Sequence, residues 1–534
     1  MRPVVSVRGL RLALPPGADR AHAVEDVSFA IAPGEILCLV GESGSGKSMC
    51  AHALMGLLPR AVRPAGGEIL LAGTDLLAQD EAGWRATRGA RIGMIFQEPM
   101  TALNPLMRVG DQIVEMFEAH GRLKAAERRA RALDLAAEVG LPDPARLLRA
   151  YPHQLSGGQR QRAMIAMALA LEPALLVADE PTTALDVTTQ AQILRLIRDL
   201  QRRHGMAVLF ITHDFGVVAE IADRVLVLRR GRVVEAGPAA ALLARPQEPY
   251  TRALLAAVPS LEPPPRPPVS GATAVEVAGL TKTYVTGGGW GRPVRRVEAA
   301  RDVGFALHRG ETLGLVGESG SGKSSVARLV LRLAEPDSGT VRLGDTDLTG
   351  LSGEALRRAR RRIQMVFQDP FASLNPRRSV GRIIADGPRA HGVPEADAMA
   401  RARDLLGLVG LDASAFDRYP HEFSGGQRQR VGIARALAVE PEVLVADEAV
   451  SALDVSVQAQ VLALLEDLKT RLGLSMLFIT HDLRVAAQIC DRIAVMRRGE
   501  IVEIKPTAAL FAAPEHPYTR ALLDAVPGRT RAAA

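Results

Sequence analysis

One octapeptide, GESGSGKS, occurs twice in the chain, at residues 41–48 and again at residues 317–324. It fits the pattern G-x-x-x-x-G-K-[ST], in which glycines let consecutive backbone N–H groups converge on phosphate oxygens. A short apolar run precedes each copy, at residues 36–40 and 312–316, as expected of a buried parallel strand. Chance can produce one such match, but not two identical ones in equivalent settings. The sequence therefore predicts two phosphate-binding loops, each between a strand and a helix.

These two loops supply most of the predicted nucleotide-binding residues. The lysines are expected to reach the β and γ phosphates, and the final serines to offer a hydroxyl to Mg²⁺. The predicted residues are Gly41, Ser43, Gly44, Ser45, Gly46, Lys47 and Ser48 in the first loop, and Gly317, Ser319, Gly320, Ser321, Gly322, Lys323 and Ser324 in the second.

The composition is that of a globular protein with more than one domain. The 534 residues are 47% hydrophobic and 23% charged, and the three cysteines are not clustered, which argues against a disulfide framework and a zinc or iron–sulfur site. No apolar run long enough for a membrane span occurs, and the N-terminus lacks the apolar stretch of a signal peptide. We interpret the net charge of +7 as an arginine-rich solvated surface. The densest basic run, residues 357–362, is expected to be a helix end that faces solvent or phospholipid headgroups.

The chain repeats itself over a long period, which indicates duplicated domains. The phosphate loops begin 276 residues apart, and the later motifs 268 residues apart. We expect a first domain at residues 1–260, a proline-rich, extended linker at 261–272, and a second domain at 273–534. Each copy opens with alternating apolar residues, which predict an antiparallel β subdomain.

A glutamine and a helical segment follow each phosphate loop. Gln97 and Gln368 end apolar β segments, and their amides can ligate Mg²⁺ or orient water. Residues 105–150 and 376–418 have a helical pattern and are predicted to form an insert. In the first copy, Leu133, Ala137 and Leu141 are expected on one face of a helix.

Three further motifs complete each copy. The sequences LSGGQRQR and FSGGQRQR precede apolar helices, so their serines and glycines predict either a second phosphate cradle or a simple helix cap; the residues are Ser156, Gly157, Gly158 and Gln159, and Ser424, Gly425, Gly426 and Gln427. The next strand ends in Asp-Glu and the one after it in a histidine. Asp179 and Asp447 suit a Mg²⁺ role through water, Glu180 and Glu448 suit polarising the attacking water, and His213 and His481 suit a hydrogen bond to the γ-phosphate. Between these motifs, residues 184–186 and 451–454 are predicted turns before a helix.

An aromatic side chain occurs near the start of the second copy only. Tyr284 can stack on adenine or can be an ordinary strand aromatic, and the aligned residue of the first copy is Leu14.

Taken together, these motifs resemble those of the ATP-binding cassette ATPases over nearly the whole chain. The resemblance implies an α/β fold with two tandem nucleotide-binding domains, each with a mixed sheet core, an antiparallel β subdomain and a helical insert. It implies ATP and Mg²⁺ as ligands, and an intramolecular pseudo-dimer in which each phosphate loop is completed by the SGGQ signature of the other half. The Mg²⁺ residues would be Ser48, Gln97 and Asp179, and Ser324, Gln368 and Asp447.

A narrower resemblance is to the oligopeptide, dipeptide and nickel importer subfamily, and to its fused, glutathione-importer-like members. It rests on QEPMTALNP (97–105), QDPFASLNP (368–376), and the tails EPYTRALLAAVP (248–259) and HPYTRALLDAVP (516–527). This subfamily implies a peripheral ATPase on the cytoplasmic face of the bacterial inner membrane. Its partners would be two membrane permease subunits, to which the helical inserts pass motion, and an extracytoplasmic substrate-binding protein. Peptide, glutathione and nickel all remain open as cargo.

Two alternatives come from other classes of cassette protein. Soluble twin-cassette ATPases that act on ribosomes have a long charged helical linker, and cassette ATPases of DNA repair need zinc-binding cysteines or long coiled coils. This chain has a proline-rich linker and scattered cysteines, so no nucleic-acid partner is expected. Within the subfamily pattern, the first copy departs at Leu14 and at Thr183, where the second has Ser451, and the second copy departs at Ala449, where the first has Pro181.

Overall fold

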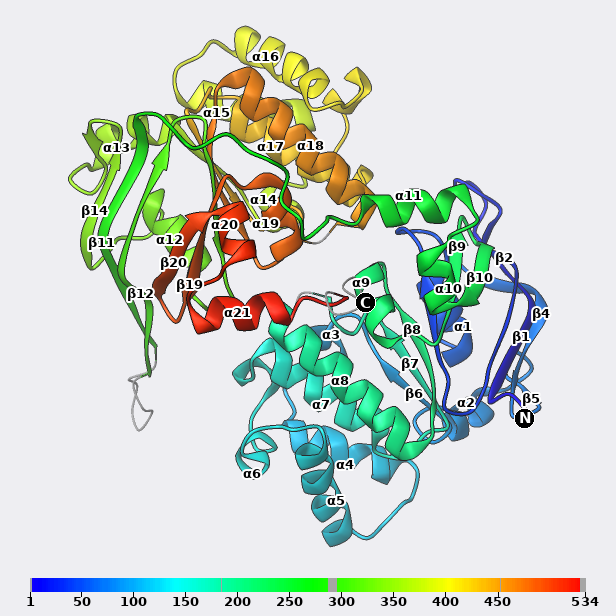
Figure 1. Cartoon of the computed structure of the whole chain (residues 1–534). Helices are drawn as coiled ribbons and strands as arrows, with labels where there is room; N and C mark the ends of the chain where they lie inside the picture. The colour runs from blue at the N-terminus through cyan, green and yellow to red at the C-terminus, as the bar shows by residue number, and fades with distance from the viewer. Residues whose placement is uncertain (1, 184, 287–294, 452, 529–534) are drawn as a thin grey trace. The chain divides into compact units, whose positions relative to one another are not determined.

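The computed structural model describes residues 2–183, 185–286, 295–451 and 453–528. The chain forms two compact units, one made mainly of residues 2–258 and the other mainly of residues 259–526 (Figure 1). The turns predicted at 184–186 and 451–454 include residues 184 and 452, which lie outside the described residues.

A six-stranded mixed sheet forms the centre of the first unit. Its strand order is β10 (Arg232–Pro238), β9 (Arg224–Arg229), β3 (Ile36–Val40), β8 (Ala207–Ile211), β7 (Leu175–Asp179) and β6 (Ile92–Ile95). All neighbours pair in parallel except β9 and β10. Every residue of β3, β7 and β8 is buried, as expected of central strands covered on both faces. The carboxyl ends of β3, β6, β7 and β8 therefore meet at one edge of the sheet.

A smaller antiparallel sheet adjoins this core. Its order is β2 (His22–Ile31), β1 (Val5–Ala13), β4 (Arg63–Leu71) and β5 (Thr74–Asp75). Alternate side chains of β1 are buried against a shared apolar cluster that also contains Leu37 and Leu39 of β3. The antiparallel subdomain is thus packed directly onto the strand that enters the phosphate loop.

Helices connect these strands in the first unit. They are α1 (Lys47–Met55), α2 (Glu81–Thr87), α3 (Pro99–Ala102), α4 (Val109–Ala119), α5 (Ala125–Glu138), α6 (Pro144–Leu147), the 3-10 turn η1 (Pro152–Gln154), α7 (Gly157–Leu169), α8 (Val187–His204), α9 (Phe215–Ile221), α10 (Ala239–Ala244) and α11 (Pro249–Ala257).

The second unit repeats this plan. Its mixed sheet runs β16 (Ile363–Val366), β17 (Val443–Asp447), β18 (Ser475–Thr480), β13 (Thr312–Val316), β19 (Arg492–Arg497) and β20 (Glu500–Pro506); its antiparallel sheet runs β12 (Arg295–His308), β11 (Thr273–Thr286), β14 (Ser338–Leu343) and β15 (Thr346–Asp347). The helices are α12 (Lys323–Val330), α13 (Gly353–Arg361), α14 (Pro370–Ser373), α15 (Val380–Ala390), α16 (Glu395–Leu408), η2 (Ala413–Phe416), η3 (Pro420–Glu422), α17 (Gly425–Leu437), α18 (Val455–Leu472), α19 (Leu483–Ile489), α20 (Thr507–Ala512) and α21 (Pro517–Asp524). The predicted fold class is confirmed.

The helical insert was predicted at the right place but with the wrong buried face in the first copy. Helices α4 and α5 pack together, as α15 and α16 do in the second unit (Figure 1). Helix α5 buries Ala132, Leu135 and Ala136. Leu133 is 41% exposed and Ala137 is also exposed, although Leu141 is buried. Both sets of residues have helical spacing, so periodicity alone does not decide which of them faces the core.

The proline-rich segment 261–272 contains neither helix nor strand and lies along the second unit. The guanidinium of Arg266, only 15% exposed, forms ion pairs with Glu466 (2.9 Å) and Asp491 (3.2 Å). Gln488 donates its amide to the carbonyls of Ser260 and Glu262 (2.9 and 3.2 Å). The linker is therefore anchored to helices α18 and α19 and to the loop that follows them.

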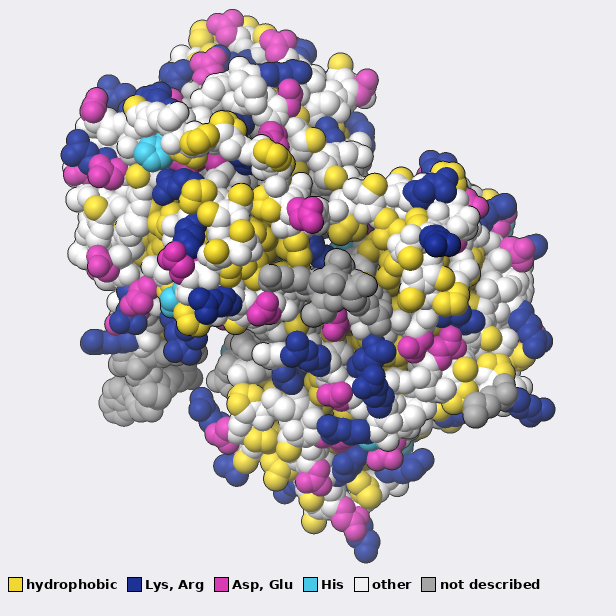
Figure 2. All heavy atoms as spheres, in the orientation of Figure 1, with side chains coloured by type: hydrophobic (Ala, Val, Ile, Leu, Met, Phe, Trp, Pro, Cys, Tyr) yellow, Lys and Arg dark blue, Asp and Glu magenta, His cyan; other side chains and the backbone are white. Residues whose placement is uncertain are grey.

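The basic run 357–362 forms the end of α13, where Arg357, Arg358 and Arg361 are exposed, as predicted for a helix end that faces solvent, while Arg360 and Arg362 have partners within the fold. The guanidinium of Arg360 donates to the carbonyls of Leu331 and Arg332, and Arg362 pairs with Glu442. On the face drawn in Figure 2, positive and negative side chains are interspersed. Across the described residues, no helix combines the length and the apolar character needed to cross a bilayer.

Candidate nucleotide sites

Each phosphate loop makes a tight turn that only glycine fits. Gly41 and Gly317 have φ of 151° and 155°, and a Cβ on either would lie 2.2 Å from a carbonyl oxygen, of Leu228 or of Met496. These carbonyls belong to β9 and β19, next to the strands that enter the loops. The loops are thus pressed against the sheet edge with no room for a side chain.

Both lysines curl back onto their own loops. Lys47 Nζ donates to the carbonyl oxygens of Gly41 (2.6 Å) and Glu42 (2.9 Å), and Lys323 Nζ to those of Gly317 (2.8 Å) and Glu318 (2.9 Å). Burial lowers the pKa of Lys323, and neighbouring carboxylates oppose the shift. An ammonium held this way is ready to neutralise an anion in the loop.

Each loop also contains one buried serine hydroxyl that is available to a ligand. The hydroxyl oxygens of Ser45 and Ser321 are buried and have no hydrogen-bond partner among the described residues. An unpaired buried hydroxyl costs stability unless a ligand satisfies it. Its place inside a glycine-rich cradle, beside a buried lysine, fits a phosphate.

A hydroxyl and a carboxylate meet beside each loop. Ser48 Oγ donates to Asp179 Oδ1 at 3.1 Å, and Ser324 Oγ to Asp447 Oδ1 at 3.1 Å. Burial raises the pKa of both aspartates, the serine hydrogen bond opposes this, and the following glutamate adds to it. Hard oxygen donors in this arrangement suit Mg²⁺, whose charge would favour the ionised aspartate.

The predicted glutamine, glutamate and histidine converge in both units. Gln97 Nε2 donates to Glu180 Oε2 at 3.1 Å, and His213 Nδ1 lies 3.2 Å from Glu180 Oε1. In the second unit, the three residues are Gln368, Glu448 and His481, and the corresponding distances are 2.7 and 3.3 Å. The strand ends of β6, β7 and β8, or of β16, β17 and β18, bring the three side chains to one place.

Both glutamates are kept ionised, although they are largely buried. Burial raises the pKa of Glu180 and Glu448, but the hydrogen bond and charge of the neighbouring histidine, with the nearby lysine, outweigh it, so each pKa lies below its ordinary value. Their backbones have φ of 46° and 47°, in the left-handed region that a non-glycine residue rarely adopts. Strain of this kind is kept where surrounding structure enforces it, often at functional sites.

The two glutamate environments differ in one hydroxyl. Thr183 Oγ1 donates to the Glu180 carboxylate (Oε2, 3.0 Å), whereas Ser451 Oγ donates to the backbone carbonyl of Glu448 (3.0 Å). In the sequence this threonine marks only a departure from the second copy, which has Ser451. The structure gives it a contact with the predicted base, and this contact helps to lower the pKa of Glu180.

The SGGQ signatures form helix caps within their own units. Ser156 Oγ accepts from Gln159 N (3.3 Å) and Gln159 Oε1 accepts from Ser156 N (3.0 Å), and Ser424 and Gln427 repeat this capping box. A Cβ on Gly158 would lie 2.6 Å from Thr189 Cγ2, so this glycine lets α8 approach α7. Ser156, Gly157, Ser424 and Gly425 are exposed. The cap alternative is thus seen, and the phosphate cradle stays a prediction.

The predicted adenine residue lies on the strand pair that touches the second loop. Tyr284 on β11 pairs in register with Val297 on β12, and its ring lies 5.8 Å from Lys282 Nζ. Two residues further along β12, the carbonyl of Ala299 stands 2.0 Å from an ideal Cβ on Gly322. Leu14, its counterpart, follows β1 and packs against the first unit's apolar cluster. The stacking role stays a prediction.

Two tyrosines next to the loops were missed at the level of sequence. Tyr250 on α11 and Tyr518 on α21 contact the second residue of the phosphate loops, Glu42 and Glu318. The tail sequence PYTRALL occurs in both copies, and this recurrence was the available signal. Sequence alone gave no reason to place a tail side chain against a loop some 200 residues away.

Comparisons with known proteins agree with this geometry. The family model described as ABC transporter matches residues 24–183 and 300–451, and the model described as oligopeptide/dipeptide transporter, C-terminal region, matches residues 234–281 and 502–533.

Two curated relatives align with almost the whole chain. The glutathione import ATP-binding protein GsiA of Salmonella choleraesuis (strain SC-B67) is 48% identical, over 98% of this chain and 90% of the relative. The peptidoglycan transport ATP-binding protein YejF of Agrobacterium fabrum is also 48% identical, over 98% of this chain and 96% of the relative. A solved structure of the ATP-binding cassette MJ0796, in a dimeric post-hydrolysis state bound to ADP and Pi, is 29% identical over 44% of this chain and 98% of that chain, with a TM-score of 0.40.

The family matches cover more than half of the chain, and the relatives match it nearly end to end. The predictions of an ATP-binding cassette protein and of an ATPase of a transporter are confirmed. This chain belongs to the ABC transporter family, as an ATPase with two ATP-binding cassettes.

Proposed function

We propose that this protein is the ATP-hydrolysing subunit of a membrane importer for peptides or related small solutes such as glutathione. The observation that carries the proposal is the presence of two complete residue sets in one chain that also bears two peptide-importer tails. Each set has its phosphate loop, glutamine, aspartate, glutamate and histidine, and each tail matches the oligopeptide/dipeptide transporter model. The relatives named for glutathione import and peptidoglycan transport support a small peptide-like cargo.

The phosphates of ATP would be bound by the loop amides, by Lys47 or Lys323, and by the buried hydroxyls of Ser45 or Ser321. Mg²⁺, when bound, supplies positive charge that offsets the negative charge of the phosphates. Ser48 and Asp179 in the first unit, with Gln97 nearby, would hold it. Ser324, Asp447 and Gln368 would do so in the second unit. The hydroxyl–carboxylate pairs at 3.1 Å fit this group.

The glutamates would direct the attacking water. Glu180 and Glu448 have a pKa below the ordinary value, so they are ionised at neutral pH and can accept a hydrogen bond from water. His213 and His481, hydrogen-bonded to these carboxylates, hold them in place and would turn to the γ-phosphate. Hydrolysis then rests on positioning and charge stabilisation.

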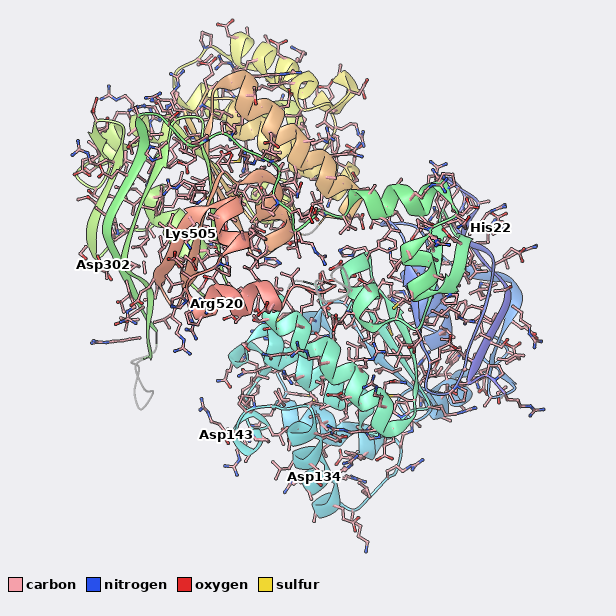
Figure 3. All side chains as sticks on the ribbon, viewed as in Figure 1. His22, Asp134, Asp143, Asp302, Lys505 and Arg520 are labelled. Carbon is pink, nitrogen blue, oxygen red and sulfur yellow. The ribbon has the colours of Figure 1, made fainter. Side chains whose placement is uncertain are left out.

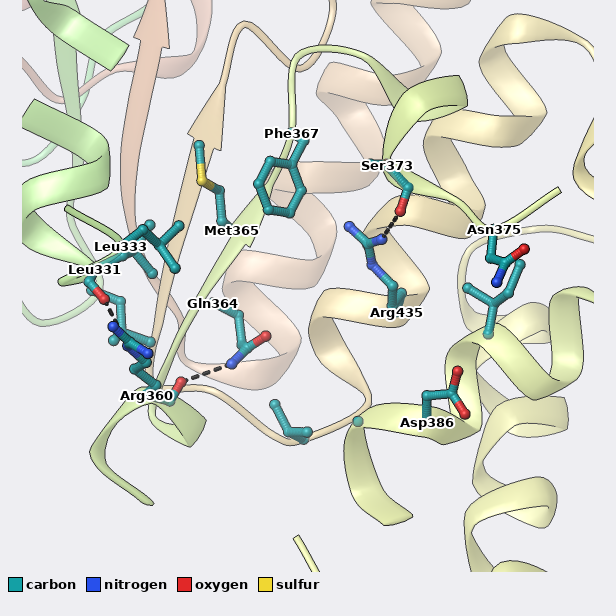
Figure 4. A pocket seen from close by; sticks show the side chains of 14 residues that line it. Leu331, Leu333, Arg360, Gln364, Met365, Phe367, Ser373, Asn375, Asp386 and Arg435 are labelled. Carbon is teal, nitrogen blue, oxygen red and sulfur yellow. Dashed lines mark hydrogen bonds between the residues drawn. The ribbon is translucent and has the colours of Figure 1, made fainter. Parts of the chain in front are cut away.

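A groove in each unit supports docking of a permease segment. In the second unit a cavity of about 350 Å³ lies between β16 and helices α13, α15 and α17 (Figure 4). Leu333 (51% exposed) and Phe367 (39% exposed) line it, and Arg435, also in its lining, donates to the carbonyl of Ser373 (Figure 4). In the first unit the matching cavity, of about 530 Å³, is lined by Met55, Met94, Met116 and Met167 among others.

Each groove is lined by the strand before Gln97 or Gln368 and by a helix of the insert. A segment bound there would therefore respond to changes at the nucleotide site. A ligand-driven shift between two arrangements of strand and insert would pass ATP energy to the permease. We further propose that the protein acts on the cytoplasmic face of the inner membrane. Two permease subunits would be its direct partners, and an extracytoplasmic binding protein would deliver cargo.

The test is co-expression of the tagged chain with any permease genes found beside its own gene. We expect recovery with the membrane fraction, and peptide or glutathione uptake in vesicles that requires both the permeases and internal ATP. Recovery with ribosomes and not with permeases would favour the soluble twin-cassette alternative. Uptake of nickel without peptide uptake would reassign the cargo.

A further inference from the structure

The C-terminal tail of each unit reaches its own nucleotide site through one hydroxyl. In the first unit, Tyr250 on α11 accepts a hydrogen bond from the backbone N–H of Glu42 (3.3 Å) and donates to the Glu42 carboxylate (3.2 Å). In the second unit, the hydroxyl of Tyr518 on α21 accepts from the N–H of Glu318 (3.1 Å). The same contact, made twice by residues about 200 positions apart in sequence, is a built feature of the fold.

The tyrosine rings are fixed as firmly as the hydroxyls. The guanidinium of Arg229 lies 4.7 Å from the centre of the Tyr250 ring, and that of Arg497 lies 4.8 Å from the Tyr518 ring. Each arginine directly follows the residue whose carbonyl abuts the first glycine of the loop, Leu228 or Met496. Tail, strand and loop therefore meet at one point.

The tail helices are themselves anchored at their starts. The Glu235 carboxylate accepts the backbone N–H groups of Gln247 (2.8 Å) and Glu248 (3.3 Å) just before α11. The Glu503 carboxylate accepts those of Glu515 and His516 (2.8 and 3.1 Å) before α21. Beside the latter, Lys505 pairs with both Glu503 and Glu515 (3.4 and 2.7 Å), and Figure 3 shows Lys505 on β20 near the helix that bears Arg520.

The loop residue between tail and lysine is held from two sides. Tyr250 fixes the N–H of Glu42 while Lys47 Nζ binds its carbonyl oxygen (2.9 Å). Tyr518 and Lys323 do the same to Glu318. Phosphate binding by backbone amides depends on their being aligned beforehand, because ordering a loop costs conformational entropy. Burial raises the pKa of both tyrosines to about 12, so each phenol stays protonated and keeps both donor and acceptor capacity.

We propose that Tyr250 and Tyr518 are positioning residues of the two ATP sites: each tail hydroxyl fixes the second residue of its phosphate loop and so tightens nucleotide binding in that unit. This inference rests on the proposed function, because it assumes that the loops bind ATP. It gives the peptide-importer tail a direct part in the ATPase site, and it links tail position to nucleotide affinity.

The test uses the full-length chain and a fluorescent ATP analogue titrated in EDTA, so that no hydrolysis occurs. The Lys323→Ala background leaves the first loop as the binding site, and Lys47→Ala leaves the second. Tyr250→Phe keeps the ring and its arginine but loses the hydroxyl. We expect it to raise the Kd of the first loop about fivefold, the effect of one net hydrogen bond, with the second loop unchanged. Tyr518→Phe should do the reverse.

A matched control is Tyr419→Phe, at a ring that stacks on His421 and is 43% exposed. It should leave both Kd values unchanged. In steady-state hydrolysis by the otherwise unaltered chain, KM for ATP should rise in each tail variant by more than kcat falls. An unchanged Kd in the variant's own background overturns the proposal. This holds also when the thermal midpoint of the nucleotide-free chain falls, because the tyrosine then only stabilises the fold. Absence of nucleotide binding by the unsubstituted chain would instead contradict the proposed function.

Discussion

At the scale of single residues, the structure brings together groups that the sequence placed far apart. Glu180 contacts Gln97 and His213 from two distant segments, and also Thr183, three residues further along its own turn. The family resemblance predicted that glutamine, glutamate and histidine share one site, and the structure gives the reason, because each follows a buried parallel strand that ends at the same sheet edge. The sequence did not predict the left-handed backbone of Glu180 or the hydroxyl of Thr183, since both depend on the local turn.

The glutamates give the first prediction. Glu180→Gln together with Glu448→Gln should lower kcat by at least about a hundredfold, the typical contribution of a general base, and leave ATP trapped on the chain. Phosphate release and retained radiolabelled ATP measure the two effects. Glu68→Gln, at a partly exposed carboxylate on β4 that pairs with Arg8, serves as the control. Turnover that persists in the double variant would remove the glutamates from the base role.

His481 gives a prediction of pH dependence. Burial lowers its pKa, but the hydrogen bond and charge of Glu448 raise it more, so the pKa lies above the ordinary value. Because the pKa of His481 is raised in the folded state, its ion pair with Glu448 stabilises the fold fully at pH values below the ordinary pKa of histidine. This stabilisation is lost as pH rises through the folded-state pKa. The difference in thermal midpoint between the unsubstituted chain and His481→Asn should therefore shrink from pH 6 to pH 9.

His391 is the matched control with the opposite sign. Burial and the charges of Arg357 and Arg361 lower its pKa, so its protonation opposes folding at low pH. The thermal midpoint of the unsubstituted chain should therefore increase relative to that of His391→Asn as pH rises. Parallel behaviour of the two variants would mean that the Glu448 pair does not govern the first.

At the scale of elements, periodicity located the helices but did not always decide which face is buried. The pattern around Leu133 and Ala137 was compatible with a buried face, yet α5 buries Ala132, Leu135 and Ala136. The two apolar faces of α5 overlap and differ in side-chain volume. Which of them is buried depends on the shape of the neighbouring helices. The linker shows the same limit: its prolines predicted an extended segment, but not the surface to which it binds.

The linker's anchor gives the third prediction. Arg266→Ala removes two ion pairs of a largely buried guanidinium, while Asp491 keeps Lys469 at 2.8 Å. We expect a loss of about 1.5–3 kcal/mol in the stability of the second unit, the range for hydrogen bonds to charged groups. Limited proteolysis should cut residues 261–272 faster.

Arg8→Ala is the control, because the Arg8–Glu68 pair (2.8 Å) is formed by side chains 65% and 39% exposed. An exposed pair of this kind is worth about 0–1 kcal/mol. Equal cleavage of the linker in both variants would show that Arg266 does not hold it.

At the scale of the whole molecule, the question is which signature completes which phosphate loop. Each signature helix begins with an exposed serine and glycine, and the serine hydroxyl accepts the cap hydrogen bond of its own unit. The family resemblance predicts that Ser424 serves the loop of Lys47, and Ser156 the loop of Lys323. This pairing is predicted from the family resemblance alone. The two signatures are nearly identical in sequence, so the residues themselves do not decide which loop each one serves.

Nucleotide trapping in the Glu180→Gln, Glu448→Gln chain decides between the two pairings. With Lys323→Ala added, only the first loop can hold ATP. Ser424→Arg should then abolish trapping, because the bulky cation occupies the place of the γ-phosphate contact, whereas Ser156→Arg should leave it unchanged. With Lys47→Ala in place of Lys323→Ala, the two signature variants should exchange their effects. If Ser156→Arg is instead the variant that empties the first loop, each unit completes its own site. The two halves would then work as separate ATPases, and duplication of the cassette within one chain would bring no shared nucleotide.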